Sequence, residues 1–425
     1  MPTYTPVIDN GGELYNVKAF GAVGDGSTDD APAFGTALAT TRKTGQYGTA
    51  AGEGQPVLVP SGRYRLNTPL NMTQTQMTLR GSGPHQSVLR GNTGGYSYGV
   101  LVDMTGATFS SLRDLDIDTT NAVGLLNLPN PTVTGILLAR NLSEGADAFG
   151  NHISNVEMRL QHSESANGYN GTFGIINVGS ETTTYDSVYV LADVALYIGS
   201  GNNLSRDNDP SHVYHAVSPF IGPILENTSM TVTSVRGCSN LVGISGPAVR
   251  IRGGADIDLG DSALLTQAFL WGLSTYPCAV EVLAQTHNLR YSGSMEGFPS
   301  LLKIQANVAG LMLDCYAAHD PNNALIVMTP GTTLTSGRIN IVPNAGSSGG
   351  KLIQAQAGTG VVVQGLDIDL YNQGIDLTSS GTLRGCVIRS TRSLAATKAG
   401  IVAGTRAGNV VLATDGVHVD GVTTW

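Results

Sequence analysis

The sequence predicts an all-β solenoid built from short strands that stack coil upon coil. Three observations lead to this fold class: a composition rich in turn-forming residues, short strands separated by Gly, Asn and Asp, and a repeat of just over twenty residues. The 425 residues include 55 glycines and only 13% charged side chains, yet 41% are hydrophobic. Gly, Ser, Thr and Asn supply the positive φ angles and local hydrogen bonds that turns need, whereas a helical bundle would need more Glu, Lys, Leu and Ala.

The repeat is seen when successive strands are aligned. Val280 falls over Leu302 (302 − 280 = 22) and Leu289 over Leu311 (311 − 289 = 22). A single coil cannot bury its apolar face, so stacking at about 4.8 Å per coil supplies both the hydrogen bonds and the core. The competing all-β array is a β-propeller, whose longer blades and aromatic signatures are missing.

The N-terminal part has a different pattern. Residues 15–19 alternate like a strand, and Asp29 or Asp30 is placed to cap a helix over about residues 29–40. Residues 57–66 are expected to form a β-hairpin that turns at a Pro-Ser-Gly sequence. The apolar positions of the expected helix are Ala33, Phe34, Ala37 and Leu38.

Two segments carry a family resemblance. Residues 16–30 read NVKAFGAVGDGSTDD and residues 57–64 read VLVPSGRY. Both resemble the N-terminal signature of the pectate-lyase-like right-handed β-helix superfamily. The resemblance implies a right-handed parallel β-helix whose first coil is capped by a helix, since an uncovered solenoid end is an exposed sheet edge. The expected organisation is an N-terminal arm at 1–14, a cap at 15–60 and a β-helix body at 61–425.

The superfamily contains phage tailspikes as well as secreted polysaccharide lyases and glycosidases, so the signature identifies fold better than function. The first residues lack a charged segment followed by an apolar run, which favours a virion protein over a secreted one. We therefore expect a homotrimeric phage tailspike, made in the host cytoplasm, that attaches to the phage tail or an adaptor protein through its N-terminal arm. At the host surface it is expected to bind, and as a depolymerase to cleave, a bacterial polysaccharide. The alternatives are a free polysaccharide lyase or glycoside hydrolase, and a non-catalytic fibre.

Charge and cysteine content exclude other classes. The net charge is −9 without any Lys/Arg run, which disfavours nucleic-acid binding and favours neutral or weakly charged glycans. No apolar stretch approaches the roughly 18 residues of a membrane span, so we expect no membrane insertion. We expect no metal and no cofactor. Four cysteines are predicted to be buried thiols: Cys238, Cys278, Cys315 and Cys386.

The coil alignment also predicts catalytic residues. With Leu289 over Leu311, Glu296 falls over Ala318, beside His319 and Asp320. Carboxylates on neighbouring coils lie about 5–9 Å apart, the range in which a pair acts on a glycosidic bond. Glu296 with Asp320 is the predicted pair, and a groove between subunits would take Asp258 of a neighbouring chain instead. Loop carboxylates without a catalytic task are the alternative.

Candidate sugar-binding residues lie near this pair and in a long polar segment, residues 199–215. That segment is expected to protrude and to contact glycan or another subunit. Aromatic rings offer stacking faces for sugars. The predicted binding residues are Trp271, Tyr291, Phe298, Tyr316, His319, Arg206, His212 and Tyr214.

Three strands, at 115–118, 255–259 and 366–370, alternate Asp with Ile or Leu. The alternation places the aspartates outward, where they are expected to form a solvated polar face. The functional alternative is a carboxylate ladder in a sugar groove. His152 and His162, with Glu157, are expected to be loop residues rather than metal ligands.

Overall fold

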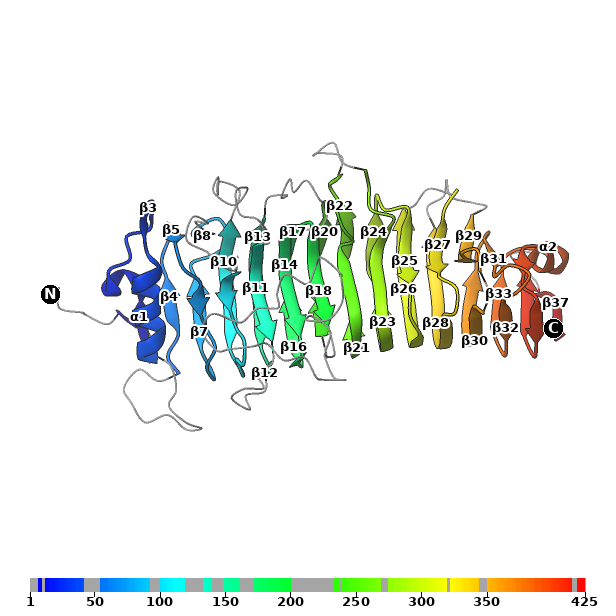
Figure 1. Cartoon of the computed structure of the whole chain (residues 1–425), viewed down its shortest axis with the longest axis horizontal. Coiled ribbons are helices and arrows are strands. Elements are labelled where there is room, and N and C mark those ends of the chain that lie inside the picture. Colours follow the sequence, from blue (N-terminus) through cyan, green and yellow to red (C-terminus); the bar gives the residue numbers. More distant parts are fainter. Residues whose placement is uncertain are drawn as a thin grey trace. The chain divides into compact units, whose positions relative to one another are not determined.

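The computed structural model divides into two compact units, residues 1–242 and 243–425. Both consist almost entirely of short parallel strands (Figure 1). The structure describes residues 7–9, 12–41, 54–91, 100–118, 133–139, 148–160, 172–199, 233–236, 239–268, 274–318, 322–343, 350–358, 360–414 and 419–424.

The first unit begins with a hairpin, a short helix pair and the first coils. Its elements are β1 (Val7–Asp9), β2 (Gly12–Asn16), the 3-10 helix η1 (Val17–Phe20), β3 (Asp25–Asp29), α1 (Ala31–Thr41), β4 (Val57–Val59), β5 (Gly62–Leu66), β6 (Leu70–Asn71), β7 (Thr78–Gly81), β8 (Ser87–Gly91), β9 (Val100–Asp103), β10 (Ser111–Asp118), β11 (Val133–Ala139), β12 (Ala148–Phe149), β13 (His152–Arg159), β14 (Thr172–Val178), β15 (Ser180–Glu181), β16 (Thr183–Asp186), β17 (Tyr189–Ala192), β18 (Val194–Gly199) and β19 (Thr233–Arg236). Strand β20 (Asn240–Gly243) spans the division between the units.

The second unit continues with β21 (Val249–Asp258), β22 (Ala263–Thr266), β23 (Cys278–Tyr291), β24 (Ser294–Glu296), β25 (Ser300–Ile304), β26 (Val308–Ala318), β27 (Ala324–Met328), β28 (Thr333–Pro343), β29 (Lys351–Ala355), β30 (Val362–Leu370), β31 (Gly374–Asp376), β32 (Thr382–Arg384), β33 (Val387–Ser390), α2 (Leu394–Ala399), β34 (Ile401–Val402), β35 (Thr405–Ala407), β36 (Val410–Thr414) and β37 (Val419–Thr424).

Strand pairing in the first unit follows three parallel series. One runs β4–β7–β10–β13–β16–β19, the second β5–β8–β10–β13–β17, and the third β6–β9–β11–β14–β18. Each strand pairs with the strand one coil later, which is the pairing of a parallel β-helix. The second unit has the same organisation, with β21–β23–β25–β27–β29–β31–β34 as its longest series.

The predicted right-handed parallel β-helix is therefore confirmed, and so is the offset read from the sequence. Val280 pairs with Leu302, and Glu296 pairs with Ala318, each 22 residues further along (302 − 280 and 318 − 296). The last strands, β36 and β37, form the antiparallel pair expected near the C-terminus.

Long strands bend at single residues with left-handed backbone. In β10 and β13 these are Asp114 (φ 59°) and Asn155 (φ 50°), and the Asn155 amide donates to the Asp114 carboxylate at 2.8 Å. In β21 and β23, Asp256 (φ 54°) and Asn288 (φ 52°) repeat the arrangement, with a 2.7 Å hydrogen bond. Asn and Asp tolerate positive φ better than other residues with a Cβ atom, which is why they occupy the bends.

Inward residues stack into continuous apolar columns. One column in the first unit consists of residues with no solvent exposure: Tyr64, Leu89, Ile117, Met158 and Val190. Burying each such side chain contributes about 1.5–3 kcal/mol. Because side chains alternate in a strand, the neighbours of each column residue must point outward.

Helix α1 covers the predicted apolar positions and begins at Ala31, where the Asp29 carboxylate accepts the Ala31 N–H at 3.2 Å. Two local predictions were wrong. Residues 17–20 form η1 instead of continuing the strand that starts before Tyr15, because the Asn16 side chain accepts the Lys18 N–H and caps a helical turn. Residues 57–66 form β4 and β5, but these do not pair as a hairpin, since each pairs in parallel with the next coil.

Three cysteines, Cys278, Cys315 and Cys386, are free and buried as predicted, and Cys238 lies outside the described residues. Within the described ranges, neither helix is long and apolar enough to cross a membrane.

Candidate functional site

Two outward rows of charged residues cross the coils of the first unit. Strands β5, β8, β10 and β13 pair in register, so corresponding side chains lie one above another. The first row is Arg63, Val88, Asp116 and Glu157, and the second is Arg65, Arg90, Asp118 and Arg159. Both flank the apolar column that contains Ile117, so the packing of the core fixes their direction.

A cavity of about 170 Å³ opens over these rows. It is lined by Arg63, His85, Val88, Asp116, Ile117, Asp118, Glu157 and Arg159. The lining combines carboxylates with guanidinium groups and an imidazole, the mixed donors and acceptors that sugar hydroxyl groups require.

Asp116 is the most enclosed acid of this cavity, with 8% of the residue exposed. Its Oδ2 atom lies 3.1 Å from His85 Nδ1, while its Oδ1 atom is buried without a hydrogen-bond partner among the described residues. Burial raises the pKa of the Asp116 carboxyl, and the charge of Glu157 raises it further, against the opposing effects of His85 and Arg159. Asp116 is thus poised to hold a proton at a higher pH than an exposed aspartate.

Glu157 is the register partner of Asp116 on the next coil. Its Oε2 atom lies 3.1 Å from His85 Nε2, and Arg159 forms an ion pair with its other oxygen. Arg159 is two residues further along β13, so its side chain leaves the same face of the strand as Glu157.

His85 lies in the turn between β7 and β8, with a left-handed backbone (φ 63°) that a non-glycine residue adopts at some energetic cost. This conformation directs the imidazole over the carboxylate pair. Ligand atoms of His85, Asp116 and Glu157 all lie within 4.8 Å of one another, close enough to hold a cation. However, each imidazole nitrogen faces a carboxylate and Arg159 already neutralises Glu157, so the contacts form a closed ion-pair network and we assign no metal to it.

The predicted catalytic residues do not line this cavity. Glu296 is exposed on β24 and pairs in register with Ala318, as the alignment predicted, but no ion pair or hydrogen bond of its carboxylate is found in the described ranges. Asp258 accepts the Gly260 N–H at 2.9 Å and so stabilises a turn. Asp320 lies outside the described residues.

Of the predicted sugar-binding aromatics, Tyr316 is 40% exposed and available. Tyr291 and Phe298 are each 1% exposed, so the prediction that their rings stack on sugars was wrong: both point into the core, and the Tyr291 hydroxyl donates to the Ser294 carbonyl. The remaining predicted binding residues lie outside the described part of the chain: Trp271, His319, Arg206, His212 and Tyr214.

The Asp-rich strands have the predicted alternation, with Ile117, Ile257 and Ile368 fully buried. For Asp116, the expectation of a solvated face was wrong, because His85 and Glu157 cover it. Glu157 and His152 lie on β13 and not in a loop, and His162 is outside the described residues. Sequence reasoning missed His85, Arg63 and Arg159; arginines at alternate positions of β5 and β8 were the available signal.

Comparison with known proteins agrees with the fold. Residues 14–208 match the family model described as rhamnogalacturonase A/epimerase, pectate lyase-like. No curated protein matches the chain closely enough to count as a relative.

Several solved structures resemble the chain at low sequence identity. The DFA-IIIase of Arthrobacter chlorophenolicus in complex with GF2 is 10% identical, with a TM-score of 0.52 over 92% of this chain and 97% of that one. The A-module of the Azotobacter vinelandii mannuronan C-5 epimerase AlgE6 is 14% identical, with a TM-score of 0.49 over 93% and 99%. A tailspike of an Acinetobacter phage is 11% identical, with a TM-score of 0.40 over 98% and 65%.

The family match and the parallel coils together confirm the resemblance predicted from residues 16–30 and 57–64. Residues 14–208 carry the sequence of the pectate lyase-like family of rhamnogalacturonase A and epimerases, on a right-handed parallel β-helix.

Proposed function

We propose that this protein is a phage tailspike that binds a bacterial surface polysaccharide and cleaves its glycosidic bonds at the Asp116–Glu157 pair. One observation carries the proposal: a covered carboxyl with a raised pKa faces a second carboxylate from the adjacent coil, with oxygens within 4.8 Å. Two carboxyl groups in unlike environments are the acid and the base or nucleophile of most glycosidases.

In this mechanism Asp116 is the general acid. As the bond between the anomeric carbon and the leaving oxygen breaks, the electron pair moves to that oxygen, which takes the Asp116 proton. Glu157 attacks the anomeric carbon and forms a covalent ester. Water then attacks the same carbon, gives its proton to Asp116 and releases Glu157. A separation this short favours direct attack over a water held between the carboxyl groups, so the product should retain its anomeric configuration.

The substrate is proposed to lie along the stack of coils. Its sugar units would then meet equivalent positions of successive strands, which are about 4.8 Å apart. Arg63 lies two coils before Asp116 in the same row, and Tyr189, half-buried on β17, pairs with Glu157 one coil later. Tyr189 is thus placed to stack on the sugar beyond the cleaved bond.

The virion assignment, the homotrimer and attachment through the N-terminal arm remain proposals that derive from the sequence resemblance. A catalytic role of Glu296, Asp258 or Asp320 also remains a prediction, with weaker support than the Asp116–Glu157 pair. A free polysaccharide hydrolase would use the same site, and a monomeric mass in solution would favour it.

The test is digestion of surface polysaccharides from candidate hosts, followed by chain-length and end-group analysis. The proposal predicts shorter chains with new reducing ends of retained configuration. Unsaturated sugars at the new ends would contradict the acid–nucleophile mechanism in favour of elimination. Unchanged chain length of a polysaccharide that the protein binds would contradict cleavage altogether.

A further inference from the structure

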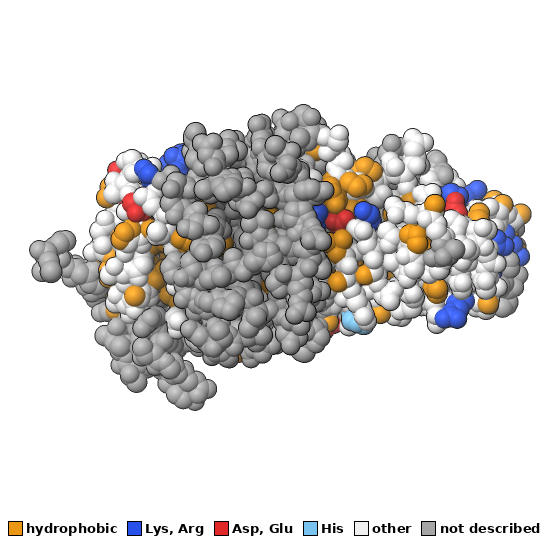
Figure 2. Space-filling model, in the orientation of Figure 1, with side chains coloured by type: hydrophobic (Ala, Val, Ile, Leu, Met, Phe, Trp, Pro, Cys, Tyr) orange, Lys and Arg blue, Asp and Glu red, His pale blue; other side chains and the backbone are white. Residues whose placement is uncertain are grey.

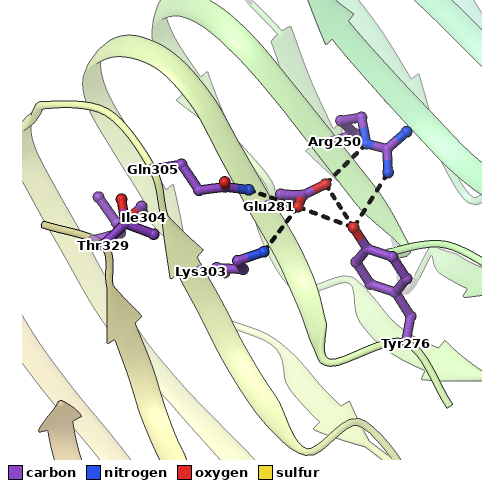
Figure 3. A network of polar contacts seen from close by, with 7 residues as sticks. All are labelled: Arg250, Tyr276, Glu281, Lys303, Ile304, Gln305 and Thr329. Atoms are coloured by element: carbon purple, nitrogen blue, oxygen red, sulfur yellow. Dashed lines mark hydrogen bonds and ion pairs between the residues drawn. The ribbon is translucent and has the colours of Figure 1, made fainter. Parts of the chain in front are cut away.

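A second polar network lies in the other unit, on the outward side of β21, β23 and β25 (Figure 3). Arg250, Glu281 and Lys303 are register partners on these successive strands. Tyr276 approaches from the segment that precedes β23, and Gln305 from the residue that follows β25. The network is separate from the cavity around Asp116, whose lining contains none of these residues.

Glu281 is the centre of the network and is only 4% exposed although it points outward. Its carboxylate accepts hydrogen bonds from the Tyr276 hydroxyl at 2.9 Å, from Arg250 Nε at 3.0 Å and from Gln305 Nε2 at 2.8 Å. Burial of a carboxylate is unfavourable unless it is paired and hydrogen-bonded. Arg250 balances the charge, and the three donors satisfy the oxygens.

Lys303 is therefore more than the carboxylate needs. Its ammonium lies 3.6 Å from Glu281 Oε1, too far for a hydrogen bond, and makes no other hydrogen bond within the described part of the chain. The side chain is 23% exposed, so it reaches solvent. Burial raises the pKa of the Tyr276 hydroxyl, which keeps it neutral at physiological pH. The charges of Arg250, Glu281 and Lys303 then sum to +1.

This local excess contrasts with a chain of net charge −9. On the face drawn in Figure 2, the described charged side chains gather in a few small groups separated by uncharged surface. A partly exposed ammonium beside a fixed guanidinium suits an anion, because Lys offers a compact charge and Arg a planar set of donors.

We propose that Lys303 and Arg250 bind an anionic substituent of the glycan, a carboxylate or a phosphate, and that Glu281 is a positioning residue that fixes both cations. The inference rests on the proposed function in that the ligand is a glycan. It corrects the expectation, drawn from net charge alone, that the glycan is neutral or weakly charged. A purely structural role is weaker, because a buried ion pair is often replaceable by apolar side chains without loss of stability.

The experiment measures binding of the full-length protein to three probes: oligomers of glucuronic acid, glucose oligomers of the same linkage, and phosphorylated glucose oligomers. Wild type should bind one of the anionic probes more tightly than the uncharged one, and which of the two it prefers identifies the substituent. Lys303→Gln should weaken anionic binding about tenfold, near 1.4 kcal/mol, without changing binding of the uncharged probe. Lys351→Gln removes an equally charged residue of an exposed ion pair and should have no effect.

Equal affinity of wild type for charged and uncharged probes, or unchanged anionic binding by folded Lys303→Gln, would overturn the proposal. Absence of saturable binding to either anionic probe would overturn it as well. Arg250→Gln provides a second variant, with thermal unfolding as the check of folding. Asp116→Asn should retain anionic binding, so loss of cleavage alone leaves this inference standing.

Discussion

Asp116 and Glu157 are register partners on adjacent parallel strands, and each lies 3.1 Å from one nitrogen of the same imidazole, His85. Strand pairing brings the two carboxyl groups together, although their charges repel. Burial then separates their roles, because Asp116 is enclosed and Glu157 has Arg159 as a counter-ion. The fold thus produces two unlike carboxyl groups at one place, which is the arrangement that acid-assisted bond cleavage requires.

The first prediction concerns stability. Asp116 has a raised pKa in the folded protein, so the folded state binds its proton more tightly than the unfolded state does. Stability is then lost as pH rises through the unfolded value of about 3.9 and on to the folded value. Asp116→Asn removes this loss and should increase the free energy of unfolding at neutral pH, with little gain near pH 3. Urea unfolding at both pH values measures it; a variant less stable than wild type at pH 7 would be the opposite result.

The second prediction concerns pH dependence. The charge of His85 lowers the pKa of Asp116, so His85→Ala should raise that pKa further. Because activity requires protonated Asp116, the alkaline limb of the kcat/KM profile should move to higher pH. His287→Ala, which removes an exposed histidine hydrogen-bonded to Gln285, is the control and should leave the limb in place. A shift to lower pH in His85→Ala would contradict the assignment.

The third prediction compares two glycines that both have room for a methyl group. Gly365 has a left-handed backbone (φ 66°) at a bend of β30, and nothing lies within 4 Å of a Cβ atom there. Gly365→Ala should therefore destabilise by about 1–2 kcal/mol through backbone strain alone. Gly35 lies inside α1 with equal space, so Gly35→Ala should stabilise by roughly 0.5–1 kcal/mol. Thermal unfolding of both variants should show shifts of opposite sign.

The fourth prediction concerns the homotrimer. Tyr316 and Val342 are register partners on β26 and β28 and are 40% and 41% exposed, forming an apolar strip that a second copy would cover. Val342→Asp should lower the mass measured by light scattering toward that of one chain, 44.0 kDa. Val402→Asp, at a similarly exposed valine, should leave the mass unchanged. A wild type that scatters as a monomer would remove the prediction.

Sequence predicted the coils well where they are short. Glu296 and Ala318 are 22 residues apart, and their pairing was read directly from the alignment. Asp116 and Glu157 are 41 residues apart (157 − 116), because a long insertion separates β10 from β13, so no constant period relates them. His85 comes from a third segment and depends on a left-handed turn. The alternation of Asp116 and Ile117 showed which way each points, but not that the turn would cover Asp116.

The predicted hairpin at 57–66 failed for a related reason. Two short strands around a Pro-Ser-Gly turn have the same pattern in a hairpin and at the corner of a coil. Pairing partners one coil away decide between the two, and those partners, β7 and β8, carry no distinguishing local signal.

The most direct test of the central claim is the depolymerisation rate of Asp116→Asn beside that of Asp367→Asn. Both aspartates lie in a Leu-Asp-Ile-Asp sequence, on β10 and β30, but Asp367 is partly exposed and paired with Arg389. Asp116→Asn should lower turnover about a hundredfold to ten-thousandfold with glycan binding intact, as loss of a general acid does. Asp367→Asn and Glu296→Gln should cleave at the wild-type rate. Near-normal cleavage by Asp116→Asn, or its loss in Glu296→Gln alone, would place the chemistry elsewhere.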